Sequence, residues 1–154
     1  DHDLVRKVLG QDGLELNFWR IAMRPGKPLI FGRIDQTPMM GMPGNPVSSL
    51  VCGLVFLRPA IRAMLGLDPH ATTQAARLGR DLGENDQRQD YLRATTETDA
   101  GGGLIVTPFE KQDSSMLSRL ARADCLILRP PHAEAAKAGA KVQILLLNGD
   151  STGI

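Results

Sequence analysis

The sequence lacks a surplus of either charge. Its 154 residues carry 18 Lys and Arg against 17 Asp and Glu, and neither residues 1–69 nor residues 70–154 form a polycation. A dedicated nucleic-acid-binding protein usually has a large basic excess, so no nucleic-acid partner is expected. Apolar residues make up 42% of the chain, which is typical of a folded globular protein and argues against wholesale disorder.

Cysteine and histidine are also scarce. Cys52 and Cys125 lie far apart inside apolar segments and are expected to be buried, reduced thiols, which indicates a cytoplasmic setting. His2, His70 and His132 have no metal-ligand spacing among themselves or with the cysteines. A zinc site is therefore not predicted.

Long uncharged apolar runs are absent. The longest apolar stretch, residues 47–57, contains two serines and a glycine and then reaches Arg58, so no membrane-spanning helix is expected. The first residues do not resemble a signal peptide, which needs a basic start before an apolar run. No initiator methionine precedes Asp1, and residues 4–9 already carry an apolar helical stripe, so we expect a fragment of a longer protein.

The apolar pattern divides the chain into two regions. The elements predicted for residues 1–69 are a helix over 3–9, strands over 14–23, 29–34 and 39–42, and a helix over 47–65. Pro59 should kink or divide the long helix, and Gly66 should end it. This is an α/β pattern, but it has too few elements to cover both faces of a parallel sheet.

Residues 70–154 change to short strands, after a linker over 67–74. The predicted strands are 75–78, 91–98, 104–109, 125–128 and 141–147, with a hairpin loop over 99–103 and a helical turn within 114–123. Five short strands in about 80 residues predict a small β-barrel or sandwich. The predicted domains are therefore an α/β region over 1–69 and an all-β domain over 70–154.

The segment FWRIAMRPGKP, residues 18–28, gathers three cations near one strand end. Arg20 and Arg24 would share a strand face about 13 Å apart, at about 3.3 Å per residue, and Lys27 follows on a loop stiffened by prolines. Arg offers a bidentate fork to an oxyanion and Lys offers a point charge, so this loop is a candidate anion site. The alternative is three solvated charges at a sheet edge.

The segment GMPGNPVSS, residues 41–49, leads into the long helix. Asn45 suits the N-cap and Pro46 the first helical position. Free backbone N–H groups would point outward there, and Ser48 and Ser49 add hydroxyl groups, so the turn could hold phosphate or another oxyanion. The alternative is an ordinary capped helix. Because ligands of α/β sheets bind near strand ends and helix starts, the two segments together indicate one oxyanion pocket.

Both segments strongly resemble the molybdopterin molybdenumtransferases, the MoeA family, which includes the gephyrin E domain. The resemblance rests on MRPGKPLIFG, GMPGNPVSSLVCGLVF and YLRATTETDAGGGLIVTPFEKQDSSMLSRLARADCLILRP. It implies that residues 1–69 are the C-terminal half of a molybdopterin-binding, MogA-like α/β domain. Residues 70–154 would be the family's C-terminal β-barrel domain.

The resemblance also implies a reaction. Adenylylated molybdopterin and molybdate would give molybdenum cofactor and AMP, with a divalent metal, usually Mg²⁺, in a homodimer with sites between subunits. Both substrates carry oxyanions, which suit a cluster of Arg, Lys and hydroxyl donors. The longer parent would be the enzyme, and this piece alone would be inactive.

The site residues follow by position within the family's motifs. The catalytic candidates are Asp3, Arg20, Arg24 and Lys27, and the candidates for binding cofactor or substrate are Pro28, Pro43, Gly44, Asn45, Pro46, Ser48, Arg93 and Ser114. No metal ligand is assigned within the chain. Arg20 stands where many members have Lys, which changes the geometry of the charge. Arg93 would be a surface residue unless two halves or two subunits close over one ligand.

Two other functions stay open. One is a non-enzymatic, dimeric scaffold of the gephyrin type, although nothing in the sequence names a peptide partner. The other is a storage module for molybdate or pterin. Binding of tungstate or molybdate at Arg24, Lys27 and Ser48 would favour the enzyme over the scaffold.

Overall fold

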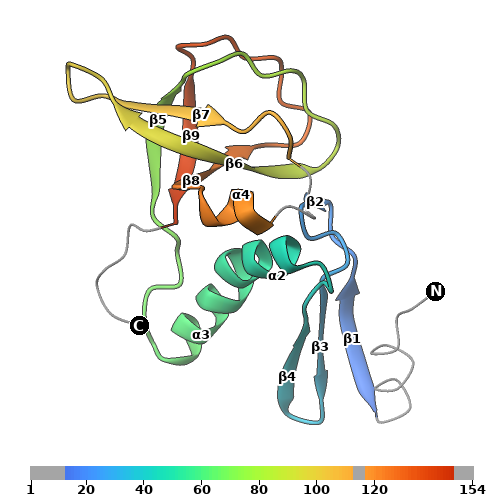
Figure 1. Ribbon diagram of the computed structural model, residues 1–154. Coiled ribbons are helices and arrows are strands. Elements are labelled where there is room, and N and C mark those ends of the chain that lie inside the picture. The colour runs from blue at the N-terminus through green and yellow to red at the C-terminus, as the bar shows by residue number, and fades with distance from the viewer. Residues whose placement is uncertain (1–12, 113–116, 148–154) are drawn as a thin grey trace.

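The computed structural model describes residues 13–112 and 117–147, which form two lobes (Figure 1). The first lobe, residues 13–66, holds a three-stranded sheet and a long helix. The second lobe, residues 73–147, is a β-barrel that Figure 1 shows above the long helix. The predicted fold class, an α/β region followed by a small all-β barrel, is confirmed. The helix predicted over 3–9 lies outside the described residues.

The first lobe begins with an antiparallel sheet. Its strands are β1 (Leu14–Trp19), β3 (Ile30–Ile34) and β4 (Thr37–Gly41), in the order β1-β3-β4. The prediction of one strand over 14–23 is wrong at its end, because Arg20 has a φ of 68°, in the left-handed region that no β-strand adopts. The chain leaves the sheet there and forms a separate short strand, β2 (Met23–Arg24), which joins the barrel sheet.

The long helix starts and ends as the sequence predicts. Its segments are α2 (Pro46–Cys52), the π-helical η1 (Gly53–Leu57) and α3 (Arg58–Met64). Pro59 does not divide it. A proline has no N–H for the carbonyl four residues back and its ring collides with that carbonyl. The wider π-turn, in which the Arg58 N–H donates to the Gly53 carbonyl, lies directly before the proline and keeps the helix continuous. Gly66, with a φ of 71°, follows the last turn.

This helix exposes apolar side chains. Leu50, Ile61 and Met64 are exposed, and only 22% of an 18-residue stretch of Pro46–Met64 is buried. By length and composition alone the helix could cross a membrane, contrary to the expectation from the sequence. A single such helix is weak evidence for a membrane protein, since core helices meet the same criterion.

The second lobe is a closed barrel of five strands. They are β5 (Thr73–Leu78), β6 (Gln89–Thr98), β7 (Leu104–Pro108), β8 (Cys125–Arg129) and β9 (Lys141–Leu146), paired in the order β6-β7-β5-β9-β8 and back to β6. All five predicted strands are confirmed, and so is the hairpin, where the Asp99 N–H donates to the Gly103 carbonyl. Helix α4 (Leu117–Ala121) lies within the predicted helical turn. The barrel core includes Val106, Ile127 and Ile144.

The two lobes share a hydrophobic cluster and a strand pairing. Met23, Leu29, Val51 and Cys52 from the first lobe pack in one cluster with Leu126 of the barrel. Strand β2 pairs in parallel with the start of β6, placing Met23 opposite Gln89 and Arg24 opposite Asp90. We call this contact, residues 23–28 against residues 85–93, the seam. It fixes the cation-bearing loop of the first lobe against the barrel.

Candidate functional site

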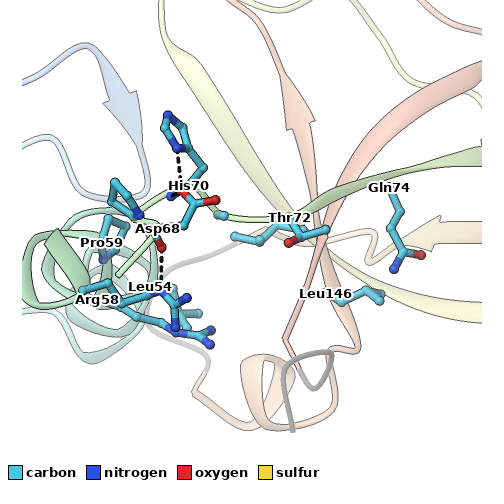
Figure 2. Close-up of a pocket in the computed structure, with 12 residues that line it drawn as sticks. Leu54, Arg58, Pro59, Asp68, His70, Thr72, Gln74 and Leu146 are labelled. Carbon is cyan, nitrogen blue, oxygen red and sulfur yellow. Dashed lines mark hydrogen bonds and ion pairs between the residues drawn. The ribbon is translucent and has the colours of Figure 1, made fainter. Parts of the chain in front are cut away.

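We consider two cavities, and the larger of them is lined by none of the predicted site residues. It has a volume of about 260 Å³ and lies where the long helix meets the connection to the barrel (Figure 2). Arg62 Nε donates to the Asp68 carbonyl at 2.7 Å, and His70 Nδ1 lies 2.7 Å from Asp68 Oδ1. The Asp68 and His70 side chains are 73% and 88% exposed. We call this region, residues 54–74, the helix-end cavity; its polar groups are solvated, so it is a weak candidate for a binding site.

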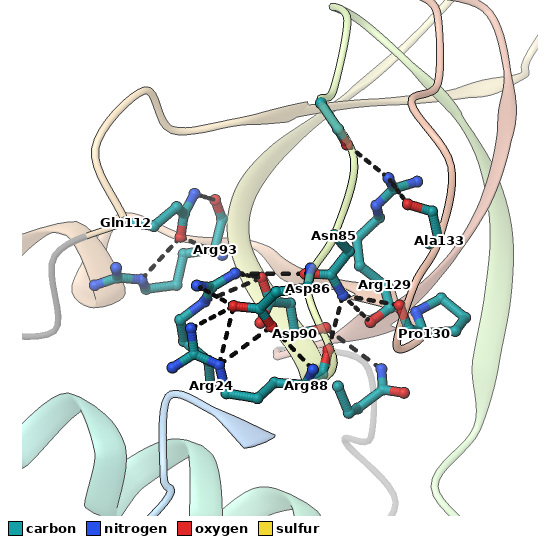
Figure 3. A network of polar contacts seen from close by, with 12 residues as sticks. Arg24, Asn85, Asp86, Arg88, Asp90, Arg93, Gln112, Arg129, Pro130 and Ala133 are labelled. Atoms are coloured by element: carbon teal, nitrogen blue, oxygen red, sulfur yellow. Dashed lines mark hydrogen bonds and ion pairs between the residues drawn. The ribbon is translucent and has the colours of Figure 1, made fainter. Parts of the chain in front are cut away.

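The seam contains a denser polar network, centred on Arg24 (Figure 3). Arg24 Nε donates to Asp90 Oδ2 at 3.1 Å, and Nη2 contacts the same oxygen. Arg24 Nη1 donates to Asp86 at 3.3 Å, and Nη2 reaches the side-chain oxygen of Asn85 at 3.4 Å. The Asp90 side chain is 5% exposed, whereas that of Arg24 is 46% exposed. The guanidinium is therefore already surrounded by acceptors.

The loop before β6 is held in place by its own side chains. Asn85 Nδ2 donates to the carbonyls of Arg88, Arg129 and Pro130. The Arg88 side chain and backbone N–H donate to Asp86, and these hydrogen bonds, with the charge of Arg24 nearby, hold the pKa of Asp86 well below its ordinary value. Asp86 is thus an anion over the whole physiological pH range.

Arg93 lies on β6, three residues after Asp90, and is only 1% exposed. The expectation of a surface residue is wrong, because the single chain already buries the Arg93 side chain without a second subunit. Gln112 Oε1 accepts from the Arg93 N–H at 3.0 Å and from Nε at 3.3 Å. Gln112 Nε2 in turn donates to the carbonyls of Arg93 and Phe109. The amide therefore sets the direction of the Arg93 side chain.

The helix start does not present the free amides that were expected. The Val47 and Ser48 N–H groups donate to Asn45 Oδ1 at 3.1 and 3.2 Å, and Pro46 has no N–H. The Ser49 hydroxyl donates to the Pro43 carbonyl. Asn45 is thus a confirmed N-cap, but it consumes the amides that would have bound an oxyanion, as in an ordinary capped helix.

The loop over 24–28 rests on the same helix. A side chain at Gly26, whose φ is 118°, would come within 2.6 Å of Cys52 Sγ, so the loop backbone lies directly against α2. Ser48 lies one turn before Cys52, on the same helix face, and is buried. The Lys27 side chain is exposed and has no hydrogen-bond or ion-pair partner among residues 13–112 and 117–147. The loop and the helix start therefore lie on one side of the molecule.

Arg20 does not join this group in the expected way. Because β1 ends at Trp19, Arg20 and Arg24 share no strand face, and the expected spacing of about 13 Å along one strand does not apply. The Arg20 guanidinium instead lies 4.0 Å from the centroid of the Trp19 ring, a cation–π contact. Asp3 and Ser114 lie outside the described residues.

A smaller cavity adjoins the seam. Its volume is about 210 Å³, and Arg24, Arg80, Asp90, Gln112 and Arg129 are among the residues that line it. Asp90 Oδ1 and Arg80 Nε are buried and have no hydrogen-bond partner within the described part of the chain. Sequence reasoning missed Asp90 and Gln112. The sequence held no signal for Asp90, because it precedes the predicted strand over 91–98 and a single aspartate does not reveal whether it is buried.

Metal and thiol chemistry find no support in the described residues. Residues 13–112 and 117–147 contain no group of three or more His, Cys, Asp or Glu side chains that could hold a metal ion, so they do not fit the Mg²⁺ that the family implies. Both cysteines are free and buried, as predicted. Burial raises the pKa of Cys52 to about 11 and that of Cys125 to about 12, so both remain protonated at neutral pH.

The chain resembles known proteins along nearly its whole length. Residues 1–63 match the family model of a probable molybdopterin binding domain, and residues 75–147 match that of the MoeA C-terminal region, domain IV. Molybdopterin molybdenumtransferase 2 of Mycobacterium tuberculosis is 35% identical over 136 residues, which cover 88% of this chain and 32% of the relative. Molybdopterin molybdenumtransferase of Haemophilus influenzae is 31% identical over 92% of this chain and 35% of its own.

A solved structure shows the same fold. The molybdopterin biosynthesis MoeA protein of Pyrococcus horikoshii superposes with a TM-score of 0.78 at 28% identity, covering 96% of this chain and 35% of that one. The chain thus spans about a third of the length of the relatives that it matches.

Proposed function

Because the chain belongs to the MoeA family and matches its C-terminal region, we propose that it forms the oxyanion-binding part of a molybdopterin molybdenumtransferase. The reaction would convert adenylylated molybdopterin and molybdate to molybdenum cofactor and AMP, in the cytoplasm. The names of the two relatives support a role in molybdenum cofactor biosynthesis. Since the chain spans about a third of them, we expect no turnover by the 154 residues alone.

The observation that carries the proposal is the pairing of β2 with β6. It lays the loop that carries the exposed Lys27 against the strand that carries the buried Arg93, although the two residues lie 66 positions apart in the sequence. Lys27 would supply a point charge and Arg93 a planar fork to a tetrahedral oxyanion. Ser48, on the adjacent helix face, would add a hydroxyl donor.

The remaining predicted residues would have supporting roles. Pro28 and the turn of Pro43, Gly44, Asn45 and Pro46 would shape the wall of the site, since the Asn45 cap fixes that turn. Asp3, Arg20 and Ser114 stay predictions from the resemblance. Mg²⁺ also stays a prediction from the resemblance, since the described residues offer no ligand set for it. Catalysis by these groups would be electrostatic, through positioning of charge around the substrate oxygens.

Oxyanion binding tests this function. Titration of the chain with sodium tungstate in a calorimeter should show binding that Lys27→Gln weakens by about tenfold, the loss expected for one charge-assisted contact of about 1.4 kcal/mol. The matched control is Lys141→Gln, the same change at an exposed lysine of β9, which should leave the affinity unchanged. Equal losses in both variants would contradict a specific site and indicate general charge attraction.

The second candidate is a non-enzymatic scaffold. The exposed Leu50, Ile61 and Met64 of the long helix favour an interaction role, because soluble proteins rarely leave such a set of apolar side chains uncovered. In a scaffold the chain would self-associate, as the expected homodimer does, but bind no tungstate. Sedimentation and the same titration, carried out together, separate the two functions.

A further inference from the structure

Among the ion pairs of Arg24, the one with Asp90 has the more buried carboxylate. We propose that this ion pair, here called the clamp, is a positioning device: Asp90 holds Arg24 so that the loop over 24–28 presents Lys27 to the oxyanion, and Arg24 is not itself an oxyanion ligand. The proposal rests on the oxyanion function above and changes the role of one of its candidate residues.

The first support is that acceptors of the barrel already engage all three nitrogens of Arg24. Each of its three nitrogens donates to an acceptor, Nε and Nη2 to Asp90, Nη1 to Asp86, and Nη2 also to Asn85. Two carboxylates already surround the single positive charge. An oxyanion that approached Arg24 would therefore meet the negative charges of Asp86 and Asp90 at close range.

The second support is that Asp90 depends on Arg24. Its side chain is 5% exposed, and among the described residues its Oδ2 is paired only with Arg24, while Oδ1 has no partner. A buried carboxylate without a counter-charge is strongly destabilising, so the two residues hold each other in place. The strand pairing beneath them covers only two residues of each strand and is extended by one hydrogen bond, from the Gln89 N–H to the Ala22 carbonyl.

The third support is the position of Lys27. It lies three residues beyond Arg24 on a loop closed by two backbone hydrogen bonds, from Ile21 to the Lys27 carbonyl and from Leu29 to the Gly26 carbonyl. Such a tight loop moves as a unit with Arg24. On the barrel side, Asp90 stands at the start of β6, so the clamp fixes the loop that carries Lys27 against this strand.

The test compares tungstate affinity in variants of the full 154-residue chain. Asp90→Asn keeps the shape of the side chain and removes its charge. The clamp predicts binding on the order of tenfold weaker, because the loop that carries Lys27 is no longer held against β6. If Arg24 were a direct ligand, the same change would free it from a competing carboxylate and strengthen binding. The sign of the effect decides between the two roles.

Two further variants distinguish loss of the clamp from a general loss of folded structure. Asp86→Asn removes the more exposed carboxylate beside Arg24 while leaving the clamp, and should change the affinity less than twofold. The double variant Arg24→Asp with Asp90→Arg re-forms the pair in reverse and should recover most of the affinity lost by Asp90→Asn. A direct role of Arg24 allows no such recovery. Circular dichroism establishes that each variant is folded at the assay temperature.

The outcomes separate this inference from the proposed function. A wild-type chain that binds no tungstate overturns both the oxyanion site and the clamp's role in it. A wild-type chain that binds tungstate, with equal or tighter binding by Asp90→Asn, overturns the clamp alone. Weaker binding by Asp90→Asn that the reversed pair does not restore also overturns it.

Discussion

The seam and the helix-end cavity are made of similar residues but differ in burial. Each combines arginine and aspartate beside a cavity, and the cavity at the helix end is the larger, at about 260 Å³ against about 210 Å³. At the seam, however, the Asp90 side chain is 5% exposed, whereas Asp68 is 73% exposed. Exposed ion pairs contribute little, while a buried charge must be matched by its surroundings. Burial of the charged groups, and not the size of the hollow, therefore distinguishes the candidate site.

The largest difference between the seam and the helix end is expected in the loss of stability on substitution of a glycine. At Gly26 a Cβ would lie 2.6 Å from Cys52 Sγ, and the φ of 118° disfavours any other residue. Gly26→Ala should lower the free energy of unfolding by about 3 kcal/mol, through overpacking and backbone strain. Gly66→Ala, where nothing lies within 4 Å, should lower it by only about 1 kcal/mol. Urea denaturation measures both, and equal losses would contradict a tightly packed seam.

A smaller difference in the free energy of unfolding is expected when an arginine of each region is replaced. Arg24→Ala leaves Asp90 buried without a counter-charge and should lower the free energy of unfolding by about 2 kcal/mol, less than for a fully buried pair because Arg24 is half exposed. Arg62→Ala removes one exposed hydrogen bond, to the Asp68 carbonyl, and should change it by less than about 0.5 kcal/mol. Thermal unfolding of the two variants and of the wild type at one pH measures both changes. A larger loss at Arg62 would reverse our comparison.

The smallest difference between the two regions is expected in how their aspartates make stability depend on pH. Hydrogen bonds from Arg88 lower the pKa of Asp86, and those from His70 lower the pKa of Asp68. A lowered pKa stabilises the folded state above the unfolded value of about 4, and this contribution disappears as the pH falls through the folded value. Asp86→Asn and Asp68→Asn should thus be less stable than wild type at pH 7 and approach it below about pH 4. The gap at pH 7 should be wider for Asp86→Asn. Unfolding curves between pH 2 and pH 7 would show whether the gap narrows as the pH falls.

Much of the fold follows from local signals. Asn45 before Pro46 predicts the helix start, because a side-chain acceptor and a residue without an N–H are what the first turn requires. The hairpin over 99–103 and the five barrel strands were predicted from turn residues and apolar alternation. The end of β1 was not, because the left-handed backbone of Arg20 has no signature in an arginine. The π-turn before Pro59 was not predicted either, since a proline allows a kink, a break or a bulge.

The candidate site was only half predictable. The motifs around Lys27 and Ser48 stand out in the sequence, and the structure places them on one side of the molecule. The free amides expected after Asn45 are consumed by its side chain, which the same residue could equally have indicated. Asp90 was not predicted as a site residue, because a single aspartate in the sequence gives no sign of whether it is buried.

The sequence by itself determined the elements, the capped helix, the barrel strands and the family, since each depends on neighbouring residues or on a contiguous motif. Only the tertiary structure decided what the cations do. Arg24 meets Asp86 and Asp90 across 62 and 66 residues of chain, where the pairing of β2 with β6 brings them together. The interaction of two charges depends on their distance and on the water around them, and both are set by folding.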